Sequence, residues 1–188
     1  MPAILLTGRP GCGKTTLLRE TIRALGVAAD GFYTEEVRAA GRRLGFDLIT
    51  LDGRRACLAS VHSRSPLRVS RYGVETEALD DLGVSAIRSA IAGASFIVVD
   101  EIDKMELYSE GFREAVLAAL NSGKPVLGSI MLGPHPFADA LKARSDVQAV
   151  TLTEANRAEL AHALLKRLQQ LIASGSQAGA PDSSRSLS

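Results

Sequence analysis

The sequence predicts an α/β fold built around a mostly parallel sheet. Residues 3–6 form an apolar run typical of a buried parallel strand. A glycine-rich turn follows, and residues 17–25 then place apolar side chains at helical spacing, as in the first half of a parallel α/β unit. Short apolar runs recur at residues 96–99 and 126–130, each followed by a further helical pattern. Together these segments predict a sheet covered by helices.

The turn after the first strand fits the pattern G-x-x-x-x-G-K-[ST], the P-loop or Walker A motif. Its glycines let the backbone bend so that successive N–H groups form an anion-binding concavity at the start of a helix. We expect Lys14 to reach the β- and γ-phosphates of a nucleotide and the Thr15 hydroxyl to hold Mg²⁺. The predicted phosphate-binding residues are Gly8, Arg9, Pro10, Gly11, Cys12, Gly13, Lys14, Thr15 and Thr16.

The composition is that of a globular chain with a core. It has 188 residues, of which 46% are hydrophobic and 23% charged. We expect one domain over residues 1–173, with an insertion at about residues 31–75, and a flexible tail at 174–188, where Ser, Gly, Ala, Pro and Asp dominate.

The formal net charge of +1 gives no reason to expect nucleic acid or a membrane surface as partner. Cys12 and Cys57 stand in no metal or redox spacing, so no disulfide scaffold is predicted. The first strand begins near residue 3, which leaves no room for a signal peptide, and we expect a cytoplasmic protein. Nothing in the sequence fixes the oligomeric state, and a monomer is our default expectation.

The insertion reads as antiparallel strands at residues 32–37, 44–51 and 56–59. One interpretation is a solvated, charged hairpin face. The other is that an arginine, first Arg38 or Arg43, reaches over the phosphates and neutralises charge on the transferred phosphoryl group. The sequence alone does not choose between them. The arginines of this segment are Arg38, Arg42, Arg43, Arg54, Arg55, Arg64, Arg68 and Arg71.

A weaker helical pattern at residues 77–92, interrupted by Gly83, leads to the apolar run at 96–99 and then to Asp100 and Glu101. Ligands of open α/β sheets bind at the carboxyl ends of the strands. We therefore expect Asp100 to be the second holder of Mg²⁺ and Glu101 to polarise an attacking water. The alternative is an exposed strand end followed by a turn.

A helix is predicted from the cap Ser109 to Gly123, followed by the core strand at 126–130. Ser129 in that strand could sense the γ-phosphate, although a satisfied strand hydroxyl is the preferred interpretation. We treat His135, in the rigid loop that follows, as structural.

The last strand is predicted at residues 148–152, and Thr153 should cap a long helix with an apolar stripe. Asn156 and Arg157 lie near the base-contact region of P-loop folds, but helix capping is the preferred role for both.

Several short sequence segments resemble those of the THEP-type, or cancer-related, nucleoside-triphosphatases, and the resemblance extends over about residues 1–172. Besides the P-loop, they are Gly31-Phe32-Tyr33-Thr34-Glu35-Glu36-Val37-Arg38, Gly45-Phe46-Asp47 and Val99-Asp100-Glu101-Ile102-Asp103-Lys104-Met105-Glu106-Leu107.

The resemblance implies a RecA-like three-layer sandwich with an antiparallel hairpin insertion. It also implies Mg²⁺-dependent hydrolysis of ATP and other nucleoside triphosphates, with loose base preference. The family usually has Gly where this chain has Asp103, which puts the turnover rate in question more than the reaction type. Carried over by position, the second nucleotide-contacting segment contains Val99, Asp100, Glu101, Ile102, Asp103 and Lys104, with Glu101 as the base.

Two other functions fit the same residues. In a small-molecule or nucleotide kinase, the acid would activate an acceptor hydroxyl and the arginines of the insertion would hold an acceptor phosphate. In a nucleotide-sensing or partner-binding module, hydrolysis would be incidental. Few aromatic residues stand near the P-loop, so a base-tolerant hydrolase is the leading hypothesis.

Overall fold

The computed structural model describes residues 3–177 and places nine strands of that range in one sheet, in the order β5-β6-β4-β3-β2-β7-β8-β1-β9. The strands are β1 (Ala3–Thr7), β2 (Ala29–Ala39), β3 (Arg42–Thr50), β4 (Arg55–Ser60), β5 (Arg68–Val69), β6 (Tyr72–Val74), β7 (Phe96–Ile102), β8 (Val126–Ile130) and β9 (Val147–Thr151).

The sheet divides into a parallel half and an antiparallel half that meet in β2. The five strands β2-β7-β8-β1-β9 are parallel to one another. The apolar runs of β1, β7 and β8 predict this arrangement, whereas β2 was expected to belong wholly to the antiparallel insertion, and its first residues instead join the parallel half. The first residues of β2 pair with β7, ending with Tyr33 opposite Asp100. From Phe32 onward the same strand pairs on its other edge with β3, antiparallel, with Glu36 opposite Phe46. The hairpins β3–β6 therefore extend the sheet sideways.

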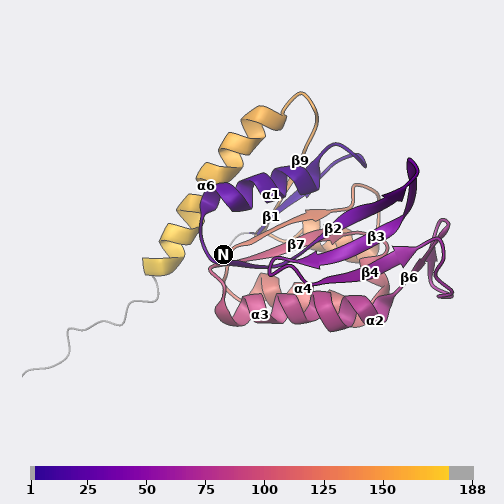
Figure 1. Cartoon of the computed structure of the whole chain (residues 1–188). Helices are drawn as coiled ribbons and strands as arrows, with labels where there is room; N and C mark the ends of the chain where they lie inside the picture. Colours follow the sequence, from indigo (N-terminus) through magenta and orange to yellow (C-terminus); the bar gives the residue numbers. More distant parts are fainter. Residues whose placement is uncertain (1–2, 178–188) are drawn as a thin grey trace, which may run out of the picture.

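Helices cover both faces of the sheet and produce three layers (Figure 1). Helices α1 and α6 lie on one face, where they bury one apolar cluster, and α3 and α4 lie on the other face over a second cluster. The bounds are α1 (Lys14–Leu25), α2 (Thr76–Ala78), η1 (Leu79–Val84), α3 (Ser85–Gly93), η2 (Glu106–Tyr108), α4 (Glu110–Asn121), α5 (Pro136–Lys142) and α6 (Arg157–Gln177).

The predicted fold class is confirmed, and one detail is corrected. Gly83 was expected to interrupt the helix at residues 77–92. Instead, the chain stays helical from α2 to α3 and passes Gly83 in the π-helical turn η1. A Cβ at Gly83 would lie 2.9 Å from side-chain atoms of both Leu48 and Leu79. The glycine therefore lets this helix approach β3 closely.

The last helix differs from its predicted bounds. It begins at Arg157, four residues after the expected cap Thr153, and continues to Gln177. The remainder of the predicted tail, residues 178–188, lies outside the described residues. None of the helices within residues 3–177 has the length and apolarity that crossing a lipid bilayer would require.

Candidate functional site

The P-loop lies between the carboxyl end of β1 and the first turn of α1. Helix α1 begins at Lys14, and its N-cap Gly13 has a φ of 92°, in the left-handed region that favours glycine. Among the described residues, no side chain caps this helix end with a hydrogen bond. The first N–H groups of a helix have no intrahelical partners, and the macrodipole places partial positive charge beside them. This end of α1 is therefore suited to an anion such as a phosphate.

Lys14 and Glu101 form an ion pair across the site. Lys14 Nζ lies 3.2 Å from Glu101 Oε1, and the two side chains are 11% and 26% exposed. The two residues come from different elements, the start of α1 and the end of β7. The structure thus brings together two of the residues that the sequence assigned to the nucleotide site.

Asp100 is fully buried beside the same residues. Its Oδ1 accepts a hydrogen bond from the Ser129 hydroxyl, so Ser129 is a satisfied strand hydroxyl, as preferred. Burial raises the pKa of Asp100, while Ser129, the Thr15 hydroxyl and the charge of Lys14 act in the opposite direction. Asp100 Oδ2 is also buried but has no hydrogen-bond partner in the described part of the chain. One carboxylate oxygen is therefore available for a ligand next to Thr15.

Glu101 follows Asp100 through a cis peptide bond. Its pKa is raised, chiefly by burial. The Lys14 charge opposes this shift, while the negative charges of Asp100 and Asp103 add to it. Glu101 therefore lies among acids, with one cation that offsets their repulsion.

The loop after β7 is closed by its own side chains. Asp103 Oδ1 accepts a hydrogen bond from the Lys104 N–H (2.6 Å), and the Asp103 N–H donates to Glu106 Oε2 (3.2 Å). Asp103, the residue that departs from the family pattern, thus closes the turn with its carboxylate. Glu106 is 3% exposed, and burial, with the nearby charges of Glu101 and Asp103, holds its pKa well above the ordinary value.

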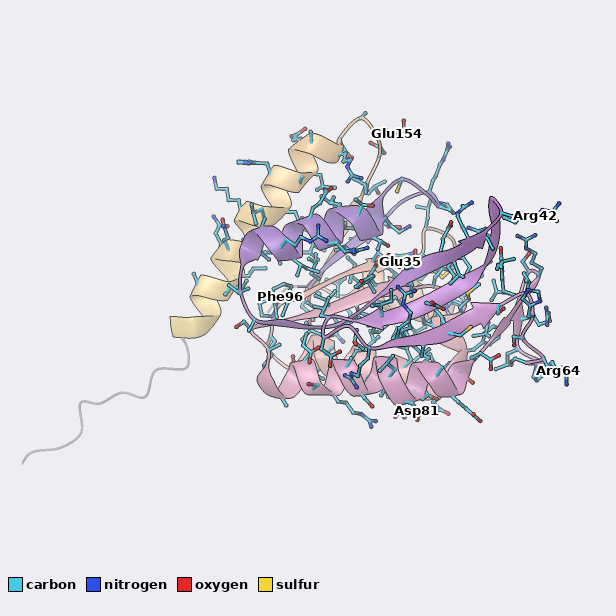
Figure 2. The ribbon with its side chains drawn as sticks, viewed as in Figure 1. Glu35, Arg42, Arg64, Asp81, Phe96 and Glu154 are labelled. Carbon is cyan, nitrogen blue, oxygen red and sulfur yellow. The ribbon has the colours of Figure 1, made fainter. Side chains whose placement is uncertain are left out.

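The arginines predicted to reach the phosphates form ion pairs within the insertion. Arg38 and Arg43 each lie 2.6 Å from a carboxylate oxygen of Glu36. Arg43 also donates to the Tyr72 hydroxyl, at 3.0 Å. Arg42 lies at the outer tip of the β2–β3 hairpin (Figure 2). These contacts agree with the interpretation as a charged hairpin face.

The guanidinium that contacts the P-loop comes from the other end of the chain. Arg157 Nη1 donates to the carbonyl of Gly13 (3.3 Å), and Nη2 lies 3.2 Å from Glu20 Oε2 in α1. A Cβ on Gly13 would lie 2.1 Å from Arg157 Nη1. One feature of the sequence could have indicated this contact. Arg157 is a cation in the first turn of a helix, where it opposes the macrodipole, so an acceptor or anionic partner for it is expected.

Two further predicted roles can be compared with the structure. His135 is structural, because its Nδ1 accepts a hydrogen bond from the Phe137 N–H (3.2 Å) and caps α5. Thr153 and Asn156 bond to each other's backbone N–H groups (3.2 and 2.8 Å) just before α6 begins. These bonds stabilise the turn before α6 and not the first N–H groups of the helix, so the predicted capping by Thr153 and Asn156 is wrong in its partner. Arg157, also predicted as a cap, bonds instead to Gly13 and Glu20.

The chain is similar to nucleoside-triphosphatases over most of its length. The model of a family described as NTPase matches residues 3–165. "Nucleoside-triphosphatase THEP1" of Thermotoga maritima is 44% identical over 166 residues, 88% of this chain and 95% of that protein. The human "Cancer-related nucleoside-triphosphatase" is 39% identical over 173 residues, 84% of this chain and 91% of that protein.

The chain is also similar in structure to solved nucleoside-triphosphatases. The crystal structure of THEP1 from the hyperthermophile Aquifex aeolicus superposes with a TM-score of 0.82 at 33% identity and covers 88% of this chain and 98% of that chain. The solution structure of a human cancer-related nucleoside triphosphatase gives a TM-score of 0.77 at 36% identity, with 90% and 98% of the two chains covered.

Proposed function

The chain belongs to the NTPase family, and from that membership we propose that it hydrolyses ATP and other nucleoside triphosphates to diphosphate and phosphate, with Mg²⁺ and with broad base tolerance. The observation that carries the proposal is the cluster at the start of α1. Three features converge there: a helix end that no described side chain caps, the Lys14–Glu101 ion pair, and the buried Asp100, whose Oδ2 has no hydrogen-bond partner within residues 3–177.

The residues present fit a magnesium ion. Mg²⁺ in nucleotide sites is bound by one or two protein oxygens, by substrate phosphates and by water. Asp100 Oδ2 is a buried acceptor with no partner in the part of the chain that the structure describes, and the Thr15 hydroxyl is close enough to lower the pKa of this carboxyl. Thr15 and Asp100 would hold the ion. When bound, Mg²⁺ supplies positive charge against the β- and γ-phosphate oxygens.

The chain's own groups account for the other parts of the reaction. The loop amides and Lys14 bind the phosphates and stabilise the charge that develops on them. Glu101 orients a water molecule in line with the γ-phosphorus and accepts its proton as the bond to the bridging oxygen breaks. Because Lys14 now neutralises Glu101 at 3.2 Å, a bound triphosphate would compete for the lysine and free the carboxylate for the water.

Two further parts of the proposal concern the base and the compartment. The chain contains three Tyr, five Phe and no Trp, so it has few rings with which to select one base by stacking. Cys12 and Cys57 are free thiols, which agrees with the reducing cytoplasm as the site of action.

The test is phosphate release from ATP, GTP, CTP and UTP, each with Mg²⁺ and with EDTA. We expect all four to be hydrolysed with kcat/KM values within about tenfold of one another, and EDTA to stop the reaction. Release from a single nucleotide would contradict the base tolerance. Undiminished release in EDTA would contradict the metal requirement, and phosphate release that depends on an acceptor would favour the kinase.

A further inference from the structure

A cavity of about 390 Å³ opens between the β5–β6 hairpin, the loop after β7 and the start of α5. This volume falls in the range of small-molecule sites, about 300–1,000 Å³. The cavity shares Lys104 with the predicted nucleotide-binding segment but contains no residue of the P-loop. Its lining residues are Arg68, Val69, Ser70, Lys104, Leu107, Tyr108 and His135.

The positive charge of this cavity is not neutralised by carboxylates. Within residues 3–177, the side chain of Arg68 donates to two backbone carbonyls, those of Ser63 (3.4 Å) and Arg71 (2.6 Å), and to no carboxylate. Lys104 Nζ has no carboxylate partner among residues 3–177. The neighbouring Asp103 carboxylate bonds to the Lys104 backbone N–H and does not line the cavity. Arg68 and Lys104 therefore both line the cavity, and none of its lining residues within the described part of the chain is acidic.

The other arginines of the insertion show the contrast. Each of those with an ion pair lies within 3.0 Å of a carboxylate oxygen on a nearby strand or turn. They are Arg38 and Arg43 with Glu36, Arg54 with Asp52, and Arg55 with Asp47 and Glu35. Among the described residues, Arg42, Arg64, Arg68 and Arg71 have no carboxylate partner, and of these four only Arg68 lines the cavity.

Neutral donors and a ring complete the lining. The hydrogen bond that His135 Nδ1 accepts from Phe137 leaves the Nε2 of that ring as the potential donor. Ser70 adds a hydroxyl. Tyr108 is 43% exposed, and its hydroxyl donates to the Arg68 carbonyl (2.9 Å), which fixes the ring at the cavity wall. Cations, neutral donors and an exposed aromatic face suit a doubly charged phosphate attached to a planar group.

We propose that this cavity is a second ligand site, distinct from the P-loop, that binds a nucleotide-sized phosphomonoester through Arg68 and Lys104 while its ring stacks on Tyr108. The class is that of a nucleoside 5′-monophosphate. Because Lys104 stands three residues after Glu101, a ligand here would lie beside the hydrolytic site, with its phosphate toward the loop that carries the predicted base.

The experiment is isothermal titration of the full chain with UMP while the P-loop is filled with Mg²⁺ and a non-hydrolysable β,γ-imido ATP. We expect one further site per chain, and no heat from uridine, which lacks the phosphate. Inorganic phosphate should bind at least about tenfold more weakly than UMP because it lacks the ring. UMP that only displaces the ATP analogue, or UMP that does not bind, would overturn the proposal. Phosphate binding as tight as that of UMP would do the same.

Four variants make the assignment specific. Arg68→Ala should weaken UMP binding about tenfold or more, since hydrogen bonds between ions are among the strongest in proteins. Arg64→Ala removes an equal charge from the same insertion, and Arg64 points outward in Figure 2. It should leave UMP affinity within about twofold. Tyr108→Phe keeps the ring and should bind UMP nearly as wild type does, whereas Tyr108→Ala should not.

Two controls distinguish loss of UMP binding from loss of folding, and a small-molecule site from a nucleic-acid site. Arg68→Ala should keep the wild-type melting temperature within a few degrees and the wild-type phosphate release, because Arg68 lies outside the P-loop. A 5′-phosphorylated oligouridylate carries the same phosphate on a polymer, and binding much tighter than that of UMP would overturn the small-molecule assignment. If the ATP analogue itself fails to bind, the proposed hydrolase is contradicted, while UMP titration of Arg68→Ala still tests this cavity.

Discussion

Lys14 Nζ lies 3.2 Å from Glu101 Oε1, so the lysine of the phosphate-binding loop is paired with the predicted general base. Each residue holds the other in place through charge in a partly buried setting. A triphosphate brings several negative oxygens to the same lysine, and the two interactions are then in competition. The structure shows the arrangement in which the ion pair closes the site, and under the proposed function a bound triphosphate would replace Glu101 as the partner of Lys14.

Lys14→Ala should abolish both nucleotide binding and turnover. The substitution removes the cation that reaches the phosphates and leaves the Glu101 carboxylate without its partner, so that the site repels a triphosphate. Binding is measured with a fluorescent ATP analogue and turnover by phosphate release. Lys166→Ala, on the exposed side of α6, is the matched control and should behave as wild type. Undiminished phosphate release by Lys14→Ala would exclude Lys14 from the site.

Glu101→Gln should leave nucleotide affinity nearly intact, while kcat falls by about two orders of magnitude or more. A positioned general base contributes roughly 10²–10⁴-fold, and the amide can orient a water but accepts its proton poorly. Single-turnover phosphate release and equilibrium binding separate the two effects. Glu110→Gln at the exposed start of α4 is the control. A kcat within a few fold of wild type would mean that another group activates the water.

The centre of the site could be predicted because each of its parts carries a local pattern. Lys14 and Thr15 follow from the spacing of one motif, and Asp100 and Glu101 follow an apolar run. Parallel strands place their carboxyl ends on one edge of the sheet, which joins the two segments although 85 residues separate Thr15 from Asp100.

The residues that were missed have contacts that no local pattern encodes. Arg157 reaches a backbone carbonyl 144 residues away, and an arginine near a helix start usually points to solvent. Glu106 follows the predicted nucleotide-contacting segment, and no role was assigned to it from the sequence. The turn η2 folds it inward, where it accepts the Asp103 N–H. Such contacts depend on how the chain ends of several elements pack together, and this is a tertiary property.

Ser129→Ala should raise the Mg²⁺ concentration needed for half-maximal turnover by about tenfold or more. The Ser129 hydroxyl bonds to Asp100 Oδ1 and thereby orients the other oxygen, which we assign to the ion. Losing such a supporting bond typically costs 10–100-fold in metal affinity or activity. Turnover is measured against Mg²⁺ at saturating ATP. Ser89→Ala, exposed on α3, is the control, and an unchanged Mg²⁺ curve for Ser129→Ala would contradict the orienting role.

Glu106→Gln should stabilise the fold at neutral pH. The pKa of Glu106 is raised above the ordinary value of 4.5 by burial and by the charges of Glu101 and Asp103. The folded state therefore retains a proton that the unfolded chain releases. The bound proton of Glu106 makes its full contribution to the stability of the folded state below about pH 4.5. This contribution is lost as the pH rises toward the pKa of Glu106 in the folded state, by up to about 1.4 kcal/mol per pH unit.

The amide cannot ionise, and its carbonyl can still accept the Asp103 N–H. Urea unfolding at pH 4.5 and pH 7.5 measures the effect. The free energy of unfolding of Glu106→Gln relative to wild type should rise by about 1 kcal/mol or more between the two pH values. Glu114→Gln, exposed on α4, should show no such change. A relative stability that falls with pH would mean that Glu106 is ionised in the folded protein.

Arg157→Ala should weaken the binding of ATP, GTP, CTP and UTP by a similar factor, about three- to tenfold, with kcat changed less than affinity. Arg157 bonds to the Gly13 carbonyl and to Glu20 at 3.2–3.3 Å, and its side chain is one-third exposed. These bonds connect the start of α6 to the predicted phosphate-binding loop. Their loss should reduce the free energy that holds the loop in place by about 0.5–1.5 kcal/mol, without changing the position of the attacking water or of Glu101.

Two variants divide that effect between its partners. Glu20→Gln removes only the exposed ion pair and should change affinity by less than about twofold. Gly13→Ala places a Cβ where the guanidinium now lies, 2.1 Å from Nη1, at a backbone φ of +92°. It should therefore lose more affinity than Arg157→Ala, since it adds backbone strain to the loss of the contact. An Arg157→Ala effect confined to one nucleotide would instead indicate that the guanidinium contacts the base.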